Sequence, residues 1–205
     1  MDRSEPVELS STMAPRKPLS PDAARLPAGL QRIVLTGFMG AGKTSAGREL
    51  ARRLGWSFAD LDVIVEERTG ISIAELFQRD GESAFRRLES SALASALARR
   101  RVVLALGGGA VETLTNRLLL EQTPATLNVF LHAPFDVLQQ RCAHHMNGAV
   151  RPVFADAAVA EQRFLIRLPF YRRIAGVTVE TTDLDLTQTV DVLLARLAQH
   201  RQSGS

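Results

Sequence analysis

Short apolar segments alternate with longer amphipathic segments along most of this sequence. Beyond residue 30, brief runs rich in Val, Ile, Leu and Ala are followed by stretches in which apolar residues recur every three or four positions. The first pattern predicts buried strands, and the second predicts helices that cover them. The expected strands are 32–36, 57–59, 102–106, 127–131 and 177–180. The expected helices are 43–54, 62–68, 73–78, 82–100, 111–122, 135–142, 158–174 and 186–200.

The regular alternation of strands and helices predicts an α/β fold. Helices that connect successive parallel strands cover both faces of the sheet, so we expect three layers with a five-stranded parallel sheet in the middle. Ligands of such sheets bind beyond the carboxyl ends of the strands. Gly37, Asp60 and Gly107 each follow an expected strand. These three positions should therefore meet at one edge of the sheet.

The two ends of the chain differ from the middle. Residues 1–30 contain five prolines among Ser, Thr and charged residues and show no sustained hydrophobic period. This composition is typical of a disordered tail, and we expect residues 202–205 to be equally loose. Residues 31–201 would then form one domain, which suits a chain of 205 residues.

Composition and charge narrow the class of protein. The chain is 45% apolar and 23% charged, which is typical of a soluble globular protein. No apolar stretch approaches the roughly 20 residues of a membrane span, and the start lacks the pattern of a secretory signal. The net charge of +3 comes with dispersed arginines, which does not favour nucleic-acid binding. A single cysteine, Cys142, is typical of a reducing compartment. We therefore expect a cytoplasmic protein with no nucleic-acid or membrane partner.

A phosphate-binding motif follows the first expected strand. Its eight residues are Gly37, Phe38, Met39, Gly40, Ala41, Gly42, Lys43 and Thr44, which satisfy G-x-x-x-x-G-K-[ST]. The glycines let backbone N–H groups turn toward a polyphosphate, while Lys43 and a helix N-terminus supply positive charge. Thr44 would then hold Mg²⁺. A simple glycine-rich turn is the alternative, but the apolar run before the motif favours a nucleotide site.

Two carboxylates follow the second expected strand. Asp60 and Asp62 lie two residues apart. Asp62 could merely cap the helix that follows. Next to a phosphate loop, however, magnesium needs a carboxylate and a kinase needs a group that orients the acceptor hydroxyl. One carboxylate for each task is a consistent assignment.

The helix expected at 82–100 carries a second candidate. Arg86 and Glu89 are three residues apart on this helix and can therefore touch. A solvated surface ion pair is one interpretation, and spacing alone favours it. The other interpretation is an arginine that Glu89 orients toward an anionic substrate, with Phe77 and Phe85 forming the wall of the pocket.

Three consecutive glycines follow the third expected strand. Gly107, Gly108 and Gly109 permit a ligand to approach the backbone closely, although a tight turn would use the same residues. Many P-loop ATPases carry an acidic residue at such a position. Because glycines stand here instead, Asp60 is the better candidate for a magnesium carboxylate.

The ordered set of motifs resembles the shikimate kinase family, a group of P-loop small-molecule kinases. The motifs are GFMGAGKT, FADLD, GISIAELF, GESAFRRLE, LALGGGA, Arg151-Pro152 and RLPFY, which begins at Arg167. The resemblance covers about residues 31 to 199. It implies a nucleoside monophosphate kinase-like fold with a mobile lid at about 144–160. It also implies transfer of the γ-phosphate of ATP to the 3-hydroxyl of shikimate, with one Mg²⁺ per subunit and a monomeric enzyme.

The resemblance also implies a role for each matching residue. Asp62, Arg86, Gly108 and Arg167 match shikimate-binding positions, and Gly107, Gly109, Phe77, Phe85 and Glu89 line or support that site. Thr44 and Asp60 match the magnesium positions. Arg141 matches an arginine that packs on adenine, and Arg151 matches the lid arginine that closes over the transferred phosphate. Asp62, Lys43 and Arg151 would be the catalytic residues. The segment 181–185 has no proline where some relatives pack one on adenine, so the second wall of the adenine site is unassigned.

Three other functions remain open at this point. Another P-loop kinase of small metabolites, such as a gluconate kinase, would use the same phosphate loop. A regulatory GTPase would need an Asn-Lys-x-Asp string for guanine, which the sequence lacks. A catalytically silent relative that only binds shikimate would need turnover measurements to exclude it.

Overall fold

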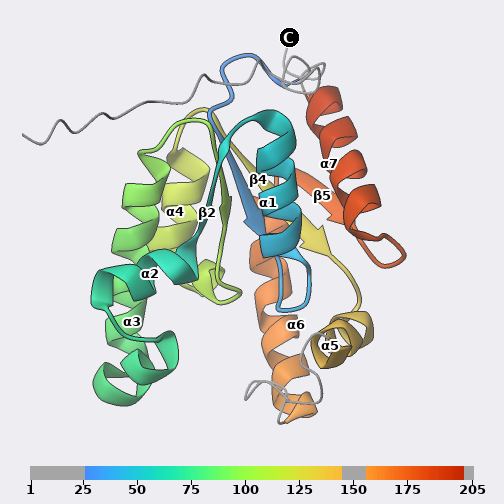
Figure 1. Ribbon diagram of the computed structural model, residues 1–205. Coiled ribbons are helices and arrows are strands. Elements are labelled where there is room, and N and C mark those ends of the chain that lie inside the picture. The colour runs from blue at the N-terminus through green and yellow to red at the C-terminus, as the bar shows by residue number, and fades with distance from the viewer. Residues whose placement is uncertain (1–25, 145–155, 201–205) are drawn as a thin grey trace, which may run out of the picture.

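The computed structural model describes residues 26–144 and 156–200, which form a parallel sheet covered by helices (Figure 1). The five strands are β1 (Arg32–Thr36), β2 (Ser57–Asp60), β3 (Val102–Ala105), β4 (Thr126–His132) and β5 (Val177–Glu180). Their order across the sheet is β2-β3-β1-β4-β5, and every neighbouring pair is parallel. The register places Arg32 of β1 between Val102 of β3 and Thr126 of β4. This confirms the expected five-stranded parallel sheet.

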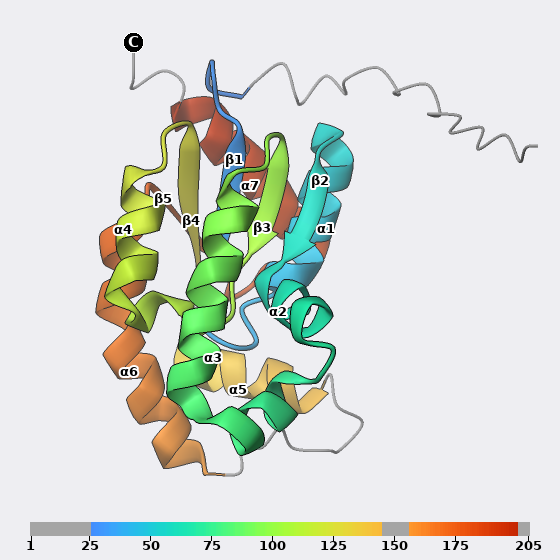
Figure 2. The same cartoon turned by 90° about the vertical axis from the view of Figure 1, so that its left-hand side faces the viewer.

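Helices cover both faces of this sheet. They are α1 (Lys43–Leu54), α2 (Leu61–Thr69), α3 (Ile73–Leu97), α4 (Leu114–Gln122), α5 (Phe135–His144), α6 (Ala157–Ile174) and α7 (Leu186–His200). Figures 1 and 2 show α1 and α7 on one face and α3, α4 and α6 on the other. The central strand β1 is therefore shielded on both sides, and Ile33, Val34 and Leu35 are completely buried. An uninterrupted apolar run is what a strand in the middle layer requires.

The carboxyl ends of the strands face the lower end of the molecule in Figure 1. Helix α2, the start of α3 and α5 all lie at this end, and α6 begins there (Figure 1). The phosphate motif, the two aspartates and the glycine loop follow β1, β2 and β3, so they all open toward it. The expectation that these positions meet at one edge of the sheet is confirmed.

One expected helix break is confirmed and one expected helix is divided. The helices expected at 73–78 and 82–100 are both present in α3, which is interrupted between them at Gly81, where φ is 78° and ψ is 170°. A positive φ of this size favours glycine, so the break lies at Gly81 itself. The helix expected at 111–122 is divided in two, because Thr113 is extended with φ −76° and ψ 122°. The first part is the 3₁₀ turn η2 (Ala110–Glu112).

Contacts with the core begin before Gln31. Leu26 and Leu30 pack against core residues, and the Leu30 amide donates to the Pro27 carbonyl at 3.2 Å. The rest of the expected tail, most of the expected lid and the C-terminal residues 201–205 lie outside the described residues. Within the described ranges, no helix combines the length and apolar character that crossing a membrane requires.

Candidate active site

The phosphate loop connects β1 to the N-terminus of α1. Gly37 has φ 145°, and a Cβ atom there would lie 2.5 Å from the Leu131 carbonyl oxygen, so only glycine fits. The Lys43 ammonium donates to the carbonyl oxygens of Gly37 and Phe38, both at 2.9 Å. The first turn of α1 contains no acidic residue. The positive end of this helix and the Lys43 charge therefore both lie at the loop, where they favour an anionic phosphate.

Asp60 links the phosphate loop to the second strand. Thr44 Oγ1 donates to Asp60 Oδ2 at 2.8 Å, and the Asp62 amide donates to Asp60 Oδ1 at 3.2 Å. Asp60, and not Asp62, is therefore the residue that caps α2. The Thr44 hydroxyl and the Asp60 carboxylate are oxygen ligands of the kind that Mg²⁺ prefers, so the residues fit a nucleotide-bound magnesium.

No further protein ligand set for a metal is present in the described part of the chain. There, no group of three or more His, Cys, Asp or Glu side chains is arranged to hold a metal ion. Magnesium in kinases is commonly shared between one or two carboxylates and substrate phosphates. The Thr44–Asp60 pair suits this shared mode.

Asp62 lies directly over the glycine loop that follows β3. A Cβ atom on Gly107 would overlap Asp62 Oδ1, so the glycine provides the space that the carboxylate occupies. Burial raises the pKa of Asp62, and the nearby Asp60 charge adds to this effect, while Lys43 and Arg86 oppose it. A carboxylate with a raised pKa at the mouth of a phosphate site is suited to accept a proton from a hydroxyl.

Arg86 reaches the same loop from α3. A Cβ atom on Gly109 would overlap Arg86 Nη2, so Gly109 makes room for the guanidinium. Arg86 donates from Nη1 to Glu89 at 2.8 Å and from Nη2 to Glu82 at 3.1 Å. The Glu89 side chain is only 1% exposed and that of Arg86 18%, so this is not the solvated surface pair that spacing alone favoured.

Burial and ion pairing have opposite effects on the pKa values of Arg86 and Glu89. Burial raises the pKa of Glu89, although Arg86 opposes the shift. Burial also disfavours the charged form of Arg86, but the pairing with Glu89 and Glu82 raises its pKa on balance. The guanidinium is therefore a permanent cation held in one place. Glu82 was not identified from the sequence, although its position four residues before Arg86 on a helix is the signal that could have found it.

Arg167 completes the set from α6. Its Nη1 lies 3.7 Å from the position of a Cβ on Gly108, and its guanidinium carbon lies 5.6 Å from the centre of the Phe38 ring. Its Nε donates to Glu112. Tyr171, one turn further along α6, donates its hydroxyl to the Gly108 carbonyl. Asp62, Arg86 and Arg167 thus each meet one glycine of the 107–109 loop.

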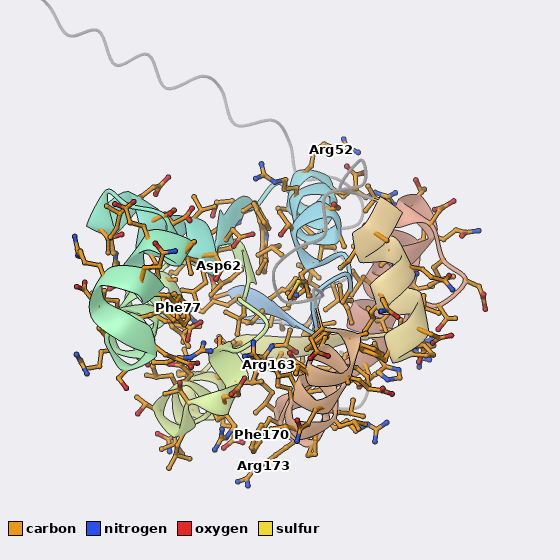
Figure 3. All side chains as sticks on the ribbon, turned by 90° about the horizontal axis from the view of Figure 1, so that it is seen from below. Arg52, Asp62, Phe77, Arg163, Phe170 and Arg173 are labelled. Carbon is orange, nitrogen blue, oxygen red and sulfur yellow. The ribbon has the colours of Figure 1, made fainter. Side chains whose placement is uncertain are left out.

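The two aromatic residues that were expected to form the wall of the pocket pack against each other. The rings of Phe77 and Phe85 are 4.8 Å apart between centroids. Phe85 is buried, whereas Phe77 is 36% exposed. In the view onto this end of the molecule, Asp62 and Phe77 lie on the side of α2 and α3, opposite Arg163 of α6 (Figure 3). The two packed rings therefore lie on the α2 and α3 side of this end of the molecule.

Arg141 lies on α5, the helix next to the phosphate loop. Helix α5 packs against the phosphate loop, because a Cβ on Gly40 would lie 2.6 Å from the Leu138 carbonyl oxygen. Arg141 donates to Thr181 Oγ1 at 3.1 Å and to the Thr182 carbonyl at 3.1 Å. The segment that the sequence left unassigned for adenine therefore holds Arg141 in position. Arg151 lies outside the described residues.

The topology and the two anion-binding features define a class of protein. The phosphate loop after the first strand of a five-stranded parallel sheet belongs to a P-loop enzyme of three layers. Arg86 and Arg167 lie around the glycines at 107–109, beside that loop, and offer a second place for an anion. The class is therefore a P-loop kinase with a small anionic acceptor.

Comparisons with known proteins identify the family. The family model described as shikimate kinase matches residues 39–198. The chain is 45% identical over 170 residues to the shikimate kinase of Nitratidesulfovibrio vulgaris, covering 82% of this chain and 95% of that protein. It is 38% identical over 182 residues to that of Bordetella avium, covering 87% and 84%. A shikimate kinase from Acinetobacter baumannii, solved in complex with shikimate, has a TM-score of 0.75 at 34% identity and covers 90% of this chain and 99% of that one.

The chain belongs to the shikimate kinase family. It is accordingly an ATP-dependent kinase that phosphorylates shikimate for the biosynthesis of aromatic amino acids. The function and family expected from the ordered motifs are confirmed, and the matches favour them over the gluconate kinase and GTPase alternatives.

Proposed function

We propose that phosphoryl transfer takes place between the phosphate loop and the glycine loop, with each residue in the role described below. The observation that carries this proposal is the convergence of Asp62, Arg86 and Arg167 on Gly107, Gly109 and Gly108. Shikimate has one carboxylate and three hydroxyls. Two arginines suit the carboxylate, and Asp62 with the backbone of the glycine loop suits the hydroxyls.

Asp62 would act on the 3-hydroxyl of shikimate. The hydroxyl oxygen attacks the γ-phosphorus of ATP, the bond between that phosphorus and the β–γ bridging oxygen breaks, and ADP leaves. Asp62 takes the hydroxyl proton and later releases it to solvent. Burial and the Asp60 charge raise the pKa of Asp62 toward neutral pH. A carboxylate with a higher pKa is a stronger base.

The phosphate loop would hold the donor. Lys43 and the N-terminus of α1 would bind the phosphates, since both carry positive charge at the loop. Thr44 and Asp60 would hold Mg²⁺, which neutralises charge on the β- and γ-phosphates when it is bound with ATP. Phosphoryl transfer depends mainly on such positioning and charge stabilisation.

Two arginines would complete the donor site. Arg141, fixed by the segment 181–182, would pack on adenine. Arg151 would close over the transferred phosphate, a role that rests on the resemblance of the Arg151-Pro152 motif alone. We also propose that the enzyme acts as a monomer in the cytoplasm, since a chain with one cysteine forms no internal disulfide, which fits a reducing compartment. Light scattering of the purified protein tests the oligomeric state.

Coupled ADP-release measurements test the proposed reaction. Turnover should require both shikimate and Mg²⁺, and the product should carry phosphate on the 3-hydroxyl. Gluconate at the same concentration serves as the matched competing acid. Absence of turnover with shikimate, or preference for gluconate, would refute the proposed acceptor.

A further inference from the structure

Glu112 lies beside the proposed acceptor site, yet its side chain has no part in the reaction described above. It ends the 3₁₀ turn η2, which directly follows the glycines at 107–109. Its carboxylate accepts a hydrogen bond from Arg167 Nε on α6, a residue 55 positions later in the chain. The Glu112 side chain is 36% exposed and that of Arg167 only 11%. The pair therefore lies at the rim of the site, with Arg167 on the inner side.

The direction of this contact determines what Arg167 presents to a ligand. Glu112 engages the Nε side of the guanidinium, and the Phe38 ring lies 5.6 Å from its central carbon. Nη1 is directed toward Gly108, with 3.7 Å to the position that a Cβ would take. The terminal nitrogen Nη1 thus faces the glycine loop, where Arg167 also interacts with the Tyr171 side chain. A guanidinium presents a planar fork of donors, so fixing one edge also fixes the direction of the other.

The two arginines of the site are balanced differently. Arg86 is paired with two carboxylates, Glu82 and Glu89, one of which is buried. Arg167 has one carboxylate partner among the described residues, Glu112. Neighbouring carboxylates therefore offset less of the positive charge of Arg167, which favours binding of an incoming carboxylate there. A flexible arginine loses side-chain entropy when it binds a ligand, and a partner that holds it beforehand reduces this loss.

We propose that Glu112 is a positioning residue for acceptor recognition. It holds Arg167 by Nε so that the terminal nitrogens are already aimed at the carboxylate of the acceptor, a small hydroxylated acid. The inference rests on the proposed acceptor role of Arg167. A simple surface salt bridge is the competing explanation, and it predicts an effect on stability without an effect on acceptor binding.

The chain contains a matched control for that explanation. Glu121 of α4 pairs with Arg173 of the same helix α6 at 3.4 Å. Their side chains are 32% and 72% exposed. Figure 3 shows Arg173 at the outer edge of the molecule, away from Asp62. Glu121→Ala therefore removes an acid that bridges to α6 without touching the acceptor site.

The test compares three variants, Glu112→Ala, Glu112→Gln and Glu121→Ala, with the unaltered full-length enzyme. We expect Glu112→Ala to raise KM for shikimate about 5- to 20-fold, with kcat and KM for ATP changed less than about threefold, because only uniform acceptor binding is lost. Glu112→Gln keeps an oxygen that accepts from Nε, so we expect its KM to stay within about threefold of normal. Glu121→Ala should leave all three constants unchanged.

Calorimetry and a neutral acceptor sharpen the test. The Kd of shikimate without nucleotide should rise in Glu112→Ala by the same factor as KM. The methyl ester of shikimate lacks the charged carboxylate, so its Kd should be the same in Glu112→Ala and in the unaltered enzyme. Equal losses for shikimate and its ester, or a lower KM in Glu112→Ala, would overturn the proposal. Absence of turnover in the unaltered enzyme would instead refute the proposed function.

Discussion

Replacing Gly109 by alanine should weaken shikimate binding without disturbing the backbone. Gly109 has φ −91° and ψ −5°, which any residue adopts. The added methyl group would overlap Arg86 Nη2 and come within 3.0 Å of Cζ and Nη1. Because these atoms belong to a side chain and not to the backbone, the guanidinium must shift from its place beside Glu89 while the backbone stays. The substitution therefore acts on one guanidinium.

The size of the effect follows from the contact that is lost. Charge-assisted hydrogen bonds contribute about 1.5–3 kcal/mol, and about 1.4 kcal/mol corresponds to a factor of ten. If the displaced Arg86 no longer reaches the acceptor carboxylate, KM for shikimate should rise about 10- to 150-fold. KM for ATP should stay near normal, since no residue of the phosphate loop is displaced. The kcat should change little, because this contact is present before and during transfer.

Initial rates of ADP release, with each substrate varied in turn, give these constants. Gly176→Ala is the matched control, because its methyl group would meet Leu127 Cδ1 at 2.7 Å at the opposite end of the sheet from the site. It should lower the melting temperature and leave both KM values unchanged. A shikimate KM of Gly109→Ala within about twofold of normal, or an equal rise in both KM values, would refute the reasoning.

Four further substitutions or measurements follow from the site. Asp62→Asn should lower kcat by on the order of 10² to 10⁴, and a nearly normal kcat would limit Asp62 to binding. Burial and Asp60 raise the pKa of Asp62, and the base must be deprotonated, so kcat/KM for shikimate should fall as the pH drops through a midpoint above the usual aspartate value. A rate that stays constant as far down as the usual aspartate pKa would contradict this. Asp60→Asn should raise the Mg²⁺ concentration for half-maximal rate about tenfold or more, and an unchanged requirement would show that this carboxylate is no ligand. Tyr171→Phe leaves the Gly108 carbonyl without its donor, so urea unfolding should show a loss of about 1–2 kcal/mol, and no loss would show that another group replaces the hydroxyl.

Local features of the site could be predicted because the residues that form them are close in sequence. The phosphate loop needs eight consecutive residues between a strand and a helix, and the structure has them there. Arg86 and Glu89 touch because they are three residues apart on a helix. The same rule applies to Glu82, which was not predicted although it lies four residues before Arg86 on the same helix.

Other features depend on distances that a sequence pattern does not contain. The burial of Glu89 follows from how α3 packs, so spacing alone favoured a surface pair. The helix break at Thr113 places Glu112 in a separate turn, where it meets Arg167 from α6. Each of these depends on packing between elements.

The sequence by itself determined the layered α/β class, the donor loop and, through the order of its motifs, the family. These depend on hydrophobic period and on short runs of residues, whose geometry is set by the local backbone. Only the tertiary structure decided that Asp62, Arg86 and Arg167, which come from three helices, meet three successive glycines. A glycine loop has no side chains of its own, so its shape and its ligands are set by what packs around it. The partners of the two arginines are likewise a consequence of the folded arrangement.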